Sequence, residues 1–258
     1  MYTRYQSGYL AHWLSLERAA DDALTQTIAG AKVDMNPHQV DAALFALASP
    51  LSNGVILADE VGLGKTIEAG LIWTELRARV DAKRLLVVCP AMLREKWRDE
   101  LADRFGVRAY IVDSKELLKH LETAKARPQQ QFALIASMQG LRPPRDWDDD
   151  QEPSQASTAK LARFLDAAEV DEPLLDMLII DEAHYLRNEE TATHKLAQLL
   201  RPVVQSMVML SATPIQLRSR DLFNLLHLLD ADSFPYESSF DLALRANAPI
   251  LALRDSVL

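Results

Sequence analysis

The sequence contains the stretch DEVGLGKT, from Asp59 to Thr66, whose residue types suit the binding of a phosphate group. Glycines let the backbone approach an anion closely, a lysine adds a positive charge on a long side chain, and a threonine hydroxyl can coordinate Mg²⁺. The usual pattern is G-x-x-x-x-G-K-[ST], and Asp59 stands where that pattern has its first glycine. The stretch therefore predicts a phosphate-binding loop with an unusual first residue. A glycine-rich turn that only caps a helix is the alternative.

The surroundings of this stretch favour the phosphate-binding interpretation. An apolar run at 54–58 precedes it and a series of strong helix formers at 65–80 follows it, so the loop would lie between a strand and a helix. The dipole and open N–H groups at the start of a helix favour an anion there. We expect ATP with Mg²⁺, because Lys65 could reach the β and γ phosphates and Thr66 could bind the metal. The candidate nucleotide-binding residues of the loop are Glu60, Gly62, Leu63, Gly64, Lys65 and Thr66.

A pair of carboxylates, Asp181 and Glu182, follows another apolar run at 177–180. Open α/β sheets bind their ligands at the carboxyl ends of the strands, which is where this pair would lie. Asp181 could hold the Mg²⁺ that Thr66 also binds, and Glu182 could polarise the attacking water, the two roles that phosphoryl transfer requires. Lys65, Asp181 and Glu182 are thus the candidate catalytic residues. An acidic pair that stabilises the start of a helix is the alternative.

The elements that would position these residues can be predicted from the alternation of short apolar runs with segments of helical periodicity. Strands are expected at 55–57, 85–89, 109–112, 132–136, 177–180 and 207–210, and helices at 37–48, 65–80, 93–105, 114–124, 191–200 and 221–229. Runs that are apolar at consecutive positions are typical of strands buried on both faces. The alternation therefore predicts a three-layer α/β domain with a mostly parallel sheet.

Two segments stand outside this alternation. Residues 1–35 contain a helical stretch at about 9–28 and are expected to form an N-terminal helical extension. Residues 142–173 are rich in Pro, Asp, Ser and Gln. Low apolar content and a run of like charges predict a solvated, flexible acidic insertion there, with a short helix at about 161–168.

The composition narrows the classes of function. A net charge of −9 argues against a broadly basic surface of the kind that grips nucleic acid, although local loops could still do so. The single cysteine, Cys89, excludes an intramolecular disulfide, and the six histidines show no metal-ligand spacing beside it. The apolar runs are shorter than the roughly 20 residues that span a bilayer, and no secretory leader is evident. We therefore expect a cytoplasmic protein.

Three motifs carry a resemblance to a known superfamily. DEVGLGKT, DEAH and LSATP, in this order, resemble motifs I, II and III of superfamily 2 helicase-like ATPases. The longer form ILADEVGLGKTIEAGLI is similar to the SWI/SNF-related branch, and most to its bacterial members typified by the RNA-polymerase-associated recycling ATPase, in which an Asp occupies the first glycine position. The resemblance covers about residues 36–250 and implies a RecA-like P-loop fold, the first of two motor lobes.

Further residues acquire roles through this resemblance. Gln39 in NPHQVDAALFAL is similar to the glutamine that reads adenine, and its amide can both donate and accept a hydrogen bond; a surface helix glutamine is the alternative. The LSATP motif implies that Ser211, Ala212 and Thr213 couple the nucleotide to nucleic acid, although the same residues could simply cap the next helix.

Contacts with nucleic acid are expected where LLVVCPAMLREKWRDEL and ALIASMQGL resemble motifs Ia and Ib. The candidates are Pro90, Arg94, Lys96, Ser137 and Gln139. These residues follow strand ends and could meet backbone phosphates, but solvated helix faces would explain them equally well. Trp97 has Leu93 and Leu101 at helical spacing, so we expect it in the core rather than stacked on a base.

The resemblance implies the ATP-binding lobe of a double-stranded DNA translocase, located in the cytoplasm with the bacterial nucleoid. In such motors a second lobe supplies arginines to the ATP site. Only twenty-three residues follow Pro235, so we expect this chain alone to be a weak or inactive ATPase. The alternative is a stand-alone nucleotide-binding module that docks on a protein partner through its N-terminal extension or acidic insertion.

Overall fold

A computed structural model describes residues 36–47, 54–58, 64–149, 154–168, 173–211 and 219–255. From residue 247 onward it describes the backbone alone. The helix expected at 9–28 lies outside these residues.

Six parallel strands form one sheet in the order β1-β6-β5-β2-β4-β3. Their bounds are β1 Gly54–Leu57, β2 Arg84–Cys89, β3 Tyr110–Val112, β4 Phe132–Ser137, β5 Leu175–Ile180 and β6 Val204–Leu210. The predicted α/β class is confirmed, and among the described residues the sheet is wholly rather than mostly parallel. All six carboxyl ends consequently lie along the same edge, which we call the carboxyl edge.

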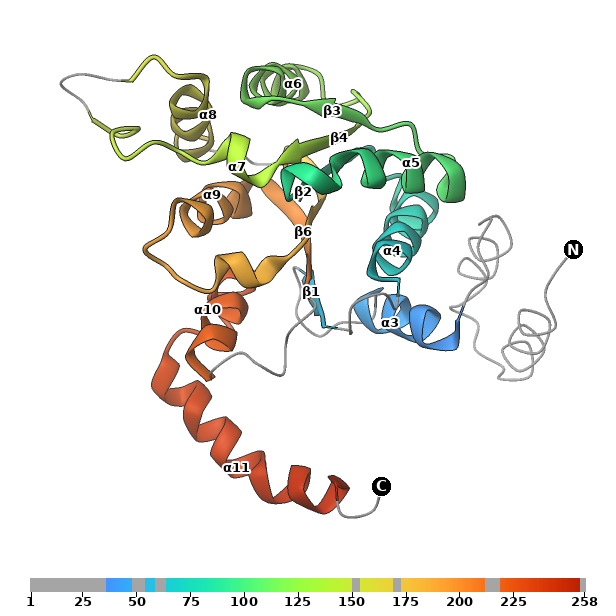
Figure 1. Cartoon of the computed structure of the whole chain (residues 1–258), viewed down its shortest axis with the longest axis vertical. Helices are drawn as coiled ribbons and strands as arrows, with labels where there is room; N and C mark the ends of the chain where they lie inside the picture. The colour runs from blue at the N-terminus through green and yellow to red at the C-terminus, as the bar shows by residue number, and fades with distance from the viewer. Residues whose placement is uncertain are drawn as a thin grey trace, which may run out of the picture.

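Helices cover both faces of this sheet, which makes three layers (Figure 1). One face carries α3 (Pro37–Leu47), α4 (Lys65–Val80) and α5 (Arg94–Phe105). The other carries α6 (Ser114–Ala126), α7 (Met138–Leu141), α8 (Ser157–Asp166), α9 (Ala192–Leu200) and α10 (Ser219–Leu229). Successive strand residues point to opposite faces. In β2, Leu85 and Val87 pack with the α3–α5 layer, and Leu86 and Val88 pack with the other.

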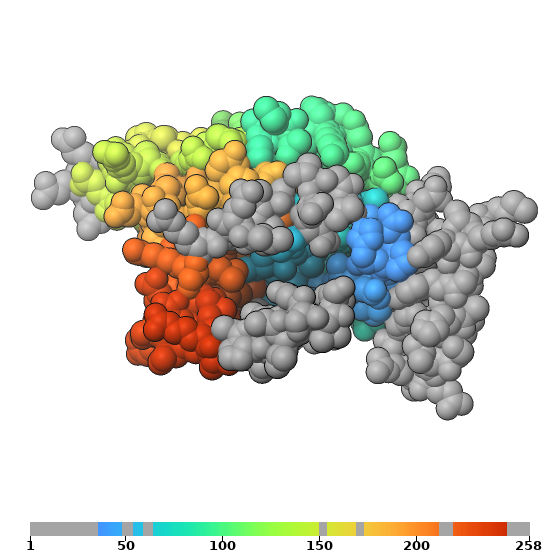
Figure 2. Space-filling model, turned by 60° about the horizontal axis from the view of Figure 1, so that its bottom comes forward, coloured from blue at the N-terminus to red at the C-terminus, as the bar shows by residue number. Residues whose placement is uncertain are grey.

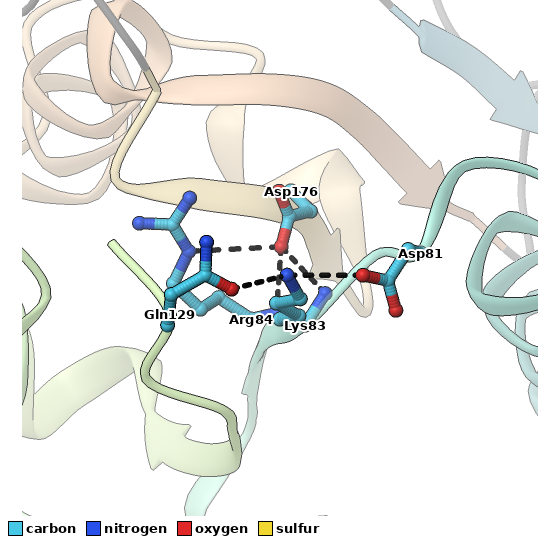
Figure 3. A network of polar contacts seen from close by, with 5 residues as sticks. All are labelled: Asp81, Lys83, Arg84, Gln129 and Asp176. Atoms are coloured by element: carbon cyan, nitrogen blue, oxygen red, sulfur yellow. Dashed lines mark hydrogen bonds and ion pairs between the residues drawn. The ribbon is translucent and has the colours of Figure 1, made fainter. Parts of the chain in front are cut away.

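The edge opposite the carboxyl edge is held by a polar network centred on Asp176 (Figure 3). Asp176 Oδ2 accepts hydrogen bonds from the backbone N–H groups of Lys83 and Arg84, both at 2.7 Å, and lies 3.6 Å from Arg84 Nε. The Lys83 ammonium in turn donates to Gln129 and pairs with Asp81. One carboxylate of β5 therefore fixes the start of β2 and the turn before it.

The acidic insertion differs from its prediction. Trp147 is buried, and the Arg163 guanidinium donates to the carbonyl oxygens of Trp147 at 2.9 Å and Ser154 at 2.7 Å. The Lys195 ammonium lies 5.5 Å from the centre of the Trp147 ring. The expectation of a solvated segment is thus wrong for Trp147 and for α8, which packs against α6 and α9. Residues 150–153 and 169–172 lie outside the described part.

The physical reason for this error lies in α8 itself. The helix buries four side chains, at 159, 161, 162 and 165, on one face. The acidic and proline-rich residues on either side of α8 dominate the average composition of 142–173. A prediction from average composition therefore misses this short apolar stripe. The helix expected at 161–168 is accordingly longer at its start, and it begins at Ser157.

A final helix, α11 (Glu237–Asp255), was not predicted and runs away from the sheet (Figure 1). The ring of Phe240, in its first turn, contacts Phe223 of α10 and Phe234 at centroid distances of 5.9 and 6.0 Å. Figure 2 shows α10 and α11, in orange and red, on one side of the molecular face and α3, in blue, on the other. Among the described helices, none is long and apolar enough to cross a lipid bilayer.

Candidate nucleotide-binding site

The start of α4 places the end of the predicted phosphate loop at the carboxyl edge. Gly64 has φ +93° and ψ 34°, a left-handed conformation that glycine adopts without strain. Its carbonyl oxygen accepts from the N–H groups of Ile67 at 2.7 Å and Glu68 at 3.2 Å, so the helix begins at once. Lys65 and Thr66 are the first two helical residues. The positive end of the helix dipole is therefore directed at the loop, as binding of an anion requires.

Gln39 lies against this glycine. Its side chain is buried, and its Oε1 accepts from the Asn36 N–H at 3.3 Å. A Cβ atom added to Gly64 would lie 2.2 Å from Gln39 Nε2. These contacts exclude a surface role for Gln39 and place its amide at the last residue of the loop. Its reading of adenine stays a prediction.

Asp181 is held in place by three hydrogen bonds. Its N–H donates to the Val88 carbonyl of β2 at 2.9 Å, which extends the sheet ladder by one residue. Its Oδ1 accepts from the Glu182 N–H and its Oδ2 from the Trp97 indole N–H, each at 2.9 Å. Both carboxylate oxygens thus have one fixed donor, and the lone pairs that remain could bind a metal or accept hydrogen bonds from its waters.

Glu182 has an uncommon backbone conformation, with φ 56° and ψ 48°. For a residue with a Cβ this left-handed conformation is strained. The carboxylate Oε2 lies 3.1 Å from His184 Nδ1. At the carboxyl edge, the turn directs the chain from β5 into the short 3-10 helix Ala183–Leu186.

Strand β6 lies between β1 and β5, the strand that Asp181 follows. Its next residue, Ser211, is buried and donates its N–H to Leu57 O of β1 at 3.0 Å. Because neighbouring strands lie about 4.8 Å apart, the ends of β1 and β5 are about 10 Å apart. Ser211 lies between them, and its coupling role stays a prediction.

Cys89, the last residue of β2, lies in the same region and is fully buried. Burial, assisted by the negative charge of Asp181, raises its pKa from 9.0 to about 12, against a smaller opposite effect of Arg94. The thiol is therefore protonated at neutral pH and is a weak nucleophile there.

The residues expected to contact nucleic acid are partly brought together. Gln139 Oε1, which follows β4, accepts from the Ala91 N–H at 3.2 Å, next to Pro90 at the end of β2. Ser137 caps α7 through the Gly140 N–H. Arg94 and Lys96 make local contacts instead, with Ala91 O at 3.1 Å and with Glu100 at 3.8 Å. Their geometry is that of a solvated helix surface, and phosphate contacts stay a prediction.

Several predicted residues cannot be placed, and one contributor was missed. Glu60, Gly62, Leu63, Ala212 and Thr213 lie outside the described residues. The Trp97 N–H bond to Asp181 was missed because Trp97 was judged by its apolar neighbours alone, and its expected core position is confirmed. A buried indole usually needs an acceptor, which was the available signal.

The arrangement fits ATP and Mg²⁺. The donor set at the edge is a lysine, a hydroxyl and an oriented carboxylate, and hard oxygen ligands are those that Mg²⁺ prefers. At Gly64 a side chain would collide with the Gln39 amide, so the backbone there is left open on the side of the helix start. The binding of phosphate by Lys65 and of the metal by Thr66 and Asp181 stays a prediction.

Together the parallel sheet, the crossover helices and this edge define a RecA-like α/β domain. The SNF2-related domain family matches residues 2–254, so the chain belongs to that family. The predicted family is thereby confirmed, whereas the closer likeness to its bacterial members stays a prediction.

Solved structures agree with this assignment at the level of the fold. The chain is similar to the Sulfolobus solfataricus SWI2/SNF2 ATPase core in complex with dsDNA, with a TM-score of 0.58 and 22% identity over 82% of this chain and 39% of that one. It is also similar to the SWI2/SNF2 ATPase core domain of the same organism, with a TM-score of 0.57 and 21% identity over 82% and 38%. The chain therefore spans less than half the length of these relatives.

Proposed function

We propose that this chain is the ATP-binding lobe of a motor that moves along double-stranded DNA. The observation that carries the proposal is the placement of Asp181, with its carboxylate held by two N–H groups, on the same edge as the start of α4. Membership of the SNF2-related domain family supports it. The similar Sulfolobus core, which was solved with dsDNA, supports duplex DNA as the partner.

In this proposal each residue at the edge has one task. Lys65 binds the β and γ phosphates, while Thr66 and Asp181 hold the metal. Glu182 orients and deprotonates the attacking water, and Gln39 selects adenine. Mg²⁺, when bound, supplies charge neutralisation for the phosphates. Ser211, between the two halves of the edge, couples this site to the nucleic acid together with Ala212 and Thr213.

Duplex DNA would lie near the ends of β2 and β4, where Pro90, Ala91 and Gln139 adjoin. Polar side chains there would meet backbone phosphates, contacts that require no recognition of the bases. The arginines for the γ phosphate would come from a second lobe, because the Sulfolobus relatives are more than twice as long as the part that matches. Location with the bacterial nucleoid would follow from this partner.

The experiment that tests the proposal measures binding of a fluorescent ATP analogue to the 258-residue chain, with and without Mg²⁺ and duplex DNA. Lys65→Ala should weaken binding by at least about tenfold, since it removes a charge-assisted contact. Lys83→Ala, at the opposite edge, is the matched control and should bind like wild type. Equal affinity of Lys65→Ala and wild type would contradict the site. Binding that shows no coupling to DNA would favour the interaction module instead.

A further inference from the structure

The hydrogen bond between Trp97 and Asp181 joins two segments that are 84 residues apart in the sequence. Trp97 lies in α5, which follows β2, and Asp181 follows β5, the neighbouring strand. The indole Nε1 lies 2.9 Å from Asp181 Oδ2. The indole N–H can only donate, and the ionised carboxylate can only accept, so the direction of the bond is fixed.

The Trp97 ring has little freedom to leave this position. It is 1% exposed and packs in the hydrophobic cluster of the α3–α5 layer, which also contains Leu101 and Cys89. Breaking its hydrogen bond would leave a buried donor without a partner, which is unfavourable. The ring therefore acts as a rigid support for one oxygen of the carboxylate.

The other oxygen is fixed from the opposite direction. Asp181 Oδ1 accepts from the Glu182 N–H, within the strained left-handed turn. With one donor on each oxygen, rotation of the carboxylate about its Cβ–Cγ bond would break both bonds. The orientation of the proposed metal ligand is thus set before any metal binds.

We propose that Trp97 is a positioning residue for the divalent metal: its indole N–H orients the Asp181 carboxylate so that the free lone pairs face the metal and its waters. This inference rests on the proposed function, because it assigns Asp181 to Mg²⁺. Partners that orient a metal ligand typically account for 10- to 100-fold in metal affinity. If Trp97 served in packing alone, the effect of removing it would not depend on the metal.

A second tryptophan offers a matched control. Trp73 of α4 is 2% exposed and belongs to the same hydrophobic cluster as Trp97. Within the described part of the chain its Nε1 has no hydrogen-bond partner. Trp97→Phe and Trp73→Phe therefore remove similar buried volumes, but only the first removes a bond to Asp181.

The first measurement is the affinity for a fluorescent ATP analogue, titrated with Mg²⁺ and again in EDTA. Trp97→Phe should weaken Mg²⁺-dependent binding by about tenfold or more and leave binding in EDTA unchanged. Trp73→Phe should match wild type in both conditions. An equal loss for both variants, or a loss in EDTA as large as in Mg²⁺, would overturn the positioning role. If wild type shows no Mg²⁺-dependent binding at all, the proposed function itself fails.

A second measurement follows the indole N–H signals by NMR in the wild-type chain, assigned from the Trp→Phe variants. The Trp97 signal should shift in Asp181→Ala, which removes its acceptor. Mn²⁺ with the nucleotide analogue should broaden it, whereas the Trp147 signal, from the other face of the sheet, should stay sharp. A Trp97 signal that is indifferent to both the Asp181 change and Mn²⁺ would refute the inference even if nucleotide still binds.

Discussion

Gly64 and Glu182 both have positive φ angles at the carboxyl edge, but only Gly64 adopts this conformation without strain. For a residue with a Cβ the left-handed conformation costs about 1–3 kcal/mol and persists only where the surroundings enforce it. Around Glu182 these surroundings are the hydrogen bond of its own N–H to Asp181 and the contact with His184. Strain that is retained beside a candidate metal ligand is consistent with a functional site.

At Gly64, conformation and space act together. We expect Gly64→Ala to abolish detectable binding of an ATP analogue, because the new Cβ would meet both a strained φ and the buried Gln39 amide. Gly106→Ala is the matched control, since Gly106 also has a positive φ, +63°, but a Cβ there would meet nothing within 4 Å. That control should lose about 1 kcal/mol of stability and bind normally. Comparable binding by both variants would show that the Gln39 contact is unimportant.

The buried thiol of Cys89 gives a prediction about pH. Since its pKa is raised from 9.0 to about 12, the folded protein favours the protonated thiol. The resulting stabilisation is fully present below pH 9 and is lost as the pH rises towards 12. At pH 8 the native chain should contain about 10³ less thiolate than the unfolded chain and react correspondingly slowly with iodoacetamide. Mass spectrometry of labelling with and without urea tests this, and equal rates would contradict it.

Single residues were predictable from the sequence where a motif fixes both type and spacing. The order of DEVGLGKT and DEAH was enough to place Lys65 and Asp181 on one edge. The orientation of Asp181 was not predictable, because it depends on Trp97, whose distance in the sequence gives no hint of contact. Predicting a tertiary hydrogen bond of this kind requires the order of the strands in the sheet, and local periodicity does not reveal that order.

At the scale of elements, prediction succeeded where an element is apolar throughout or has clear ends. Helix α4 was predicted with its observed bounds from the loop glycine before it and its series of helix formers, and in the structure a left-handed Asp81 ends it. The starts of β5 and β6 were placed two and three residues late. The first residues of these strands include Asp176 and Gln205. Both are polar, so a prediction based on runs of apolar residues leaves them out.

Asp176 should contribute to the stability of the fold and not to the binding of nucleotide. Asp176→Ala removes the acceptor of the backbone N–H groups of Lys83 and Arg84, at the start of β2. We therefore expect a loss of about 2 kcal/mol in the free energy of unfolding. Binding of an ATP analogue should stay unchanged, because the carboxyl edge is at the other end of the strands. Asp81→Asn, whose side chain is exposed, should change the stability by less than about 0.5 kcal/mol. Urea denaturation measures both.

Arg163 should keep the insertion at 142–173 ordered in its described segments. Arg163→Met retains the apolar stem but loses the bonds to the carbonyl oxygens of Trp147 and Ser154. We expect faster amide exchange in the segments 142–149 and 154–168, with a local loss of about 1–3 kcal/mol. Arg145→Met, at an exposed position of the same insertion, should exchange like wild type. Unchanged exchange in the Arg163 variant would show that Trp147 is held by its ring contacts alone.

For the whole molecule, the parallel sheet gathers residues from distant parts of the sequence onto one edge. The segments after β1, β2, β4, β5 and β6 all emerge there, so residues that follow different strands, such as Pro90, Gln139 and Asp181, come to the same edge. This layout followed from the sequence once the strands were predicted as parallel. The packing of α8 and the course of α11 could not be predicted from the sequence, because they depend on tertiary contacts of the folded chain.

The last prediction concerns turnover by the chain by itself. If arginines from a second lobe complete the site, the 258-residue chain should bind Mg²⁺ and an ATP analogue but hydrolyse ATP very slowly. Such arginines contribute about 10³ to 10⁵ in rate in phosphoryl-transfer enzymes. Phosphate release is measured with and without duplex DNA, single strands and RNA, and Glu182→Gln provides the background rate. Wild type should be close to that background under all conditions, whereas substantial DNA-stimulated turnover would show that the 258 residues already contain every group that catalysis needs.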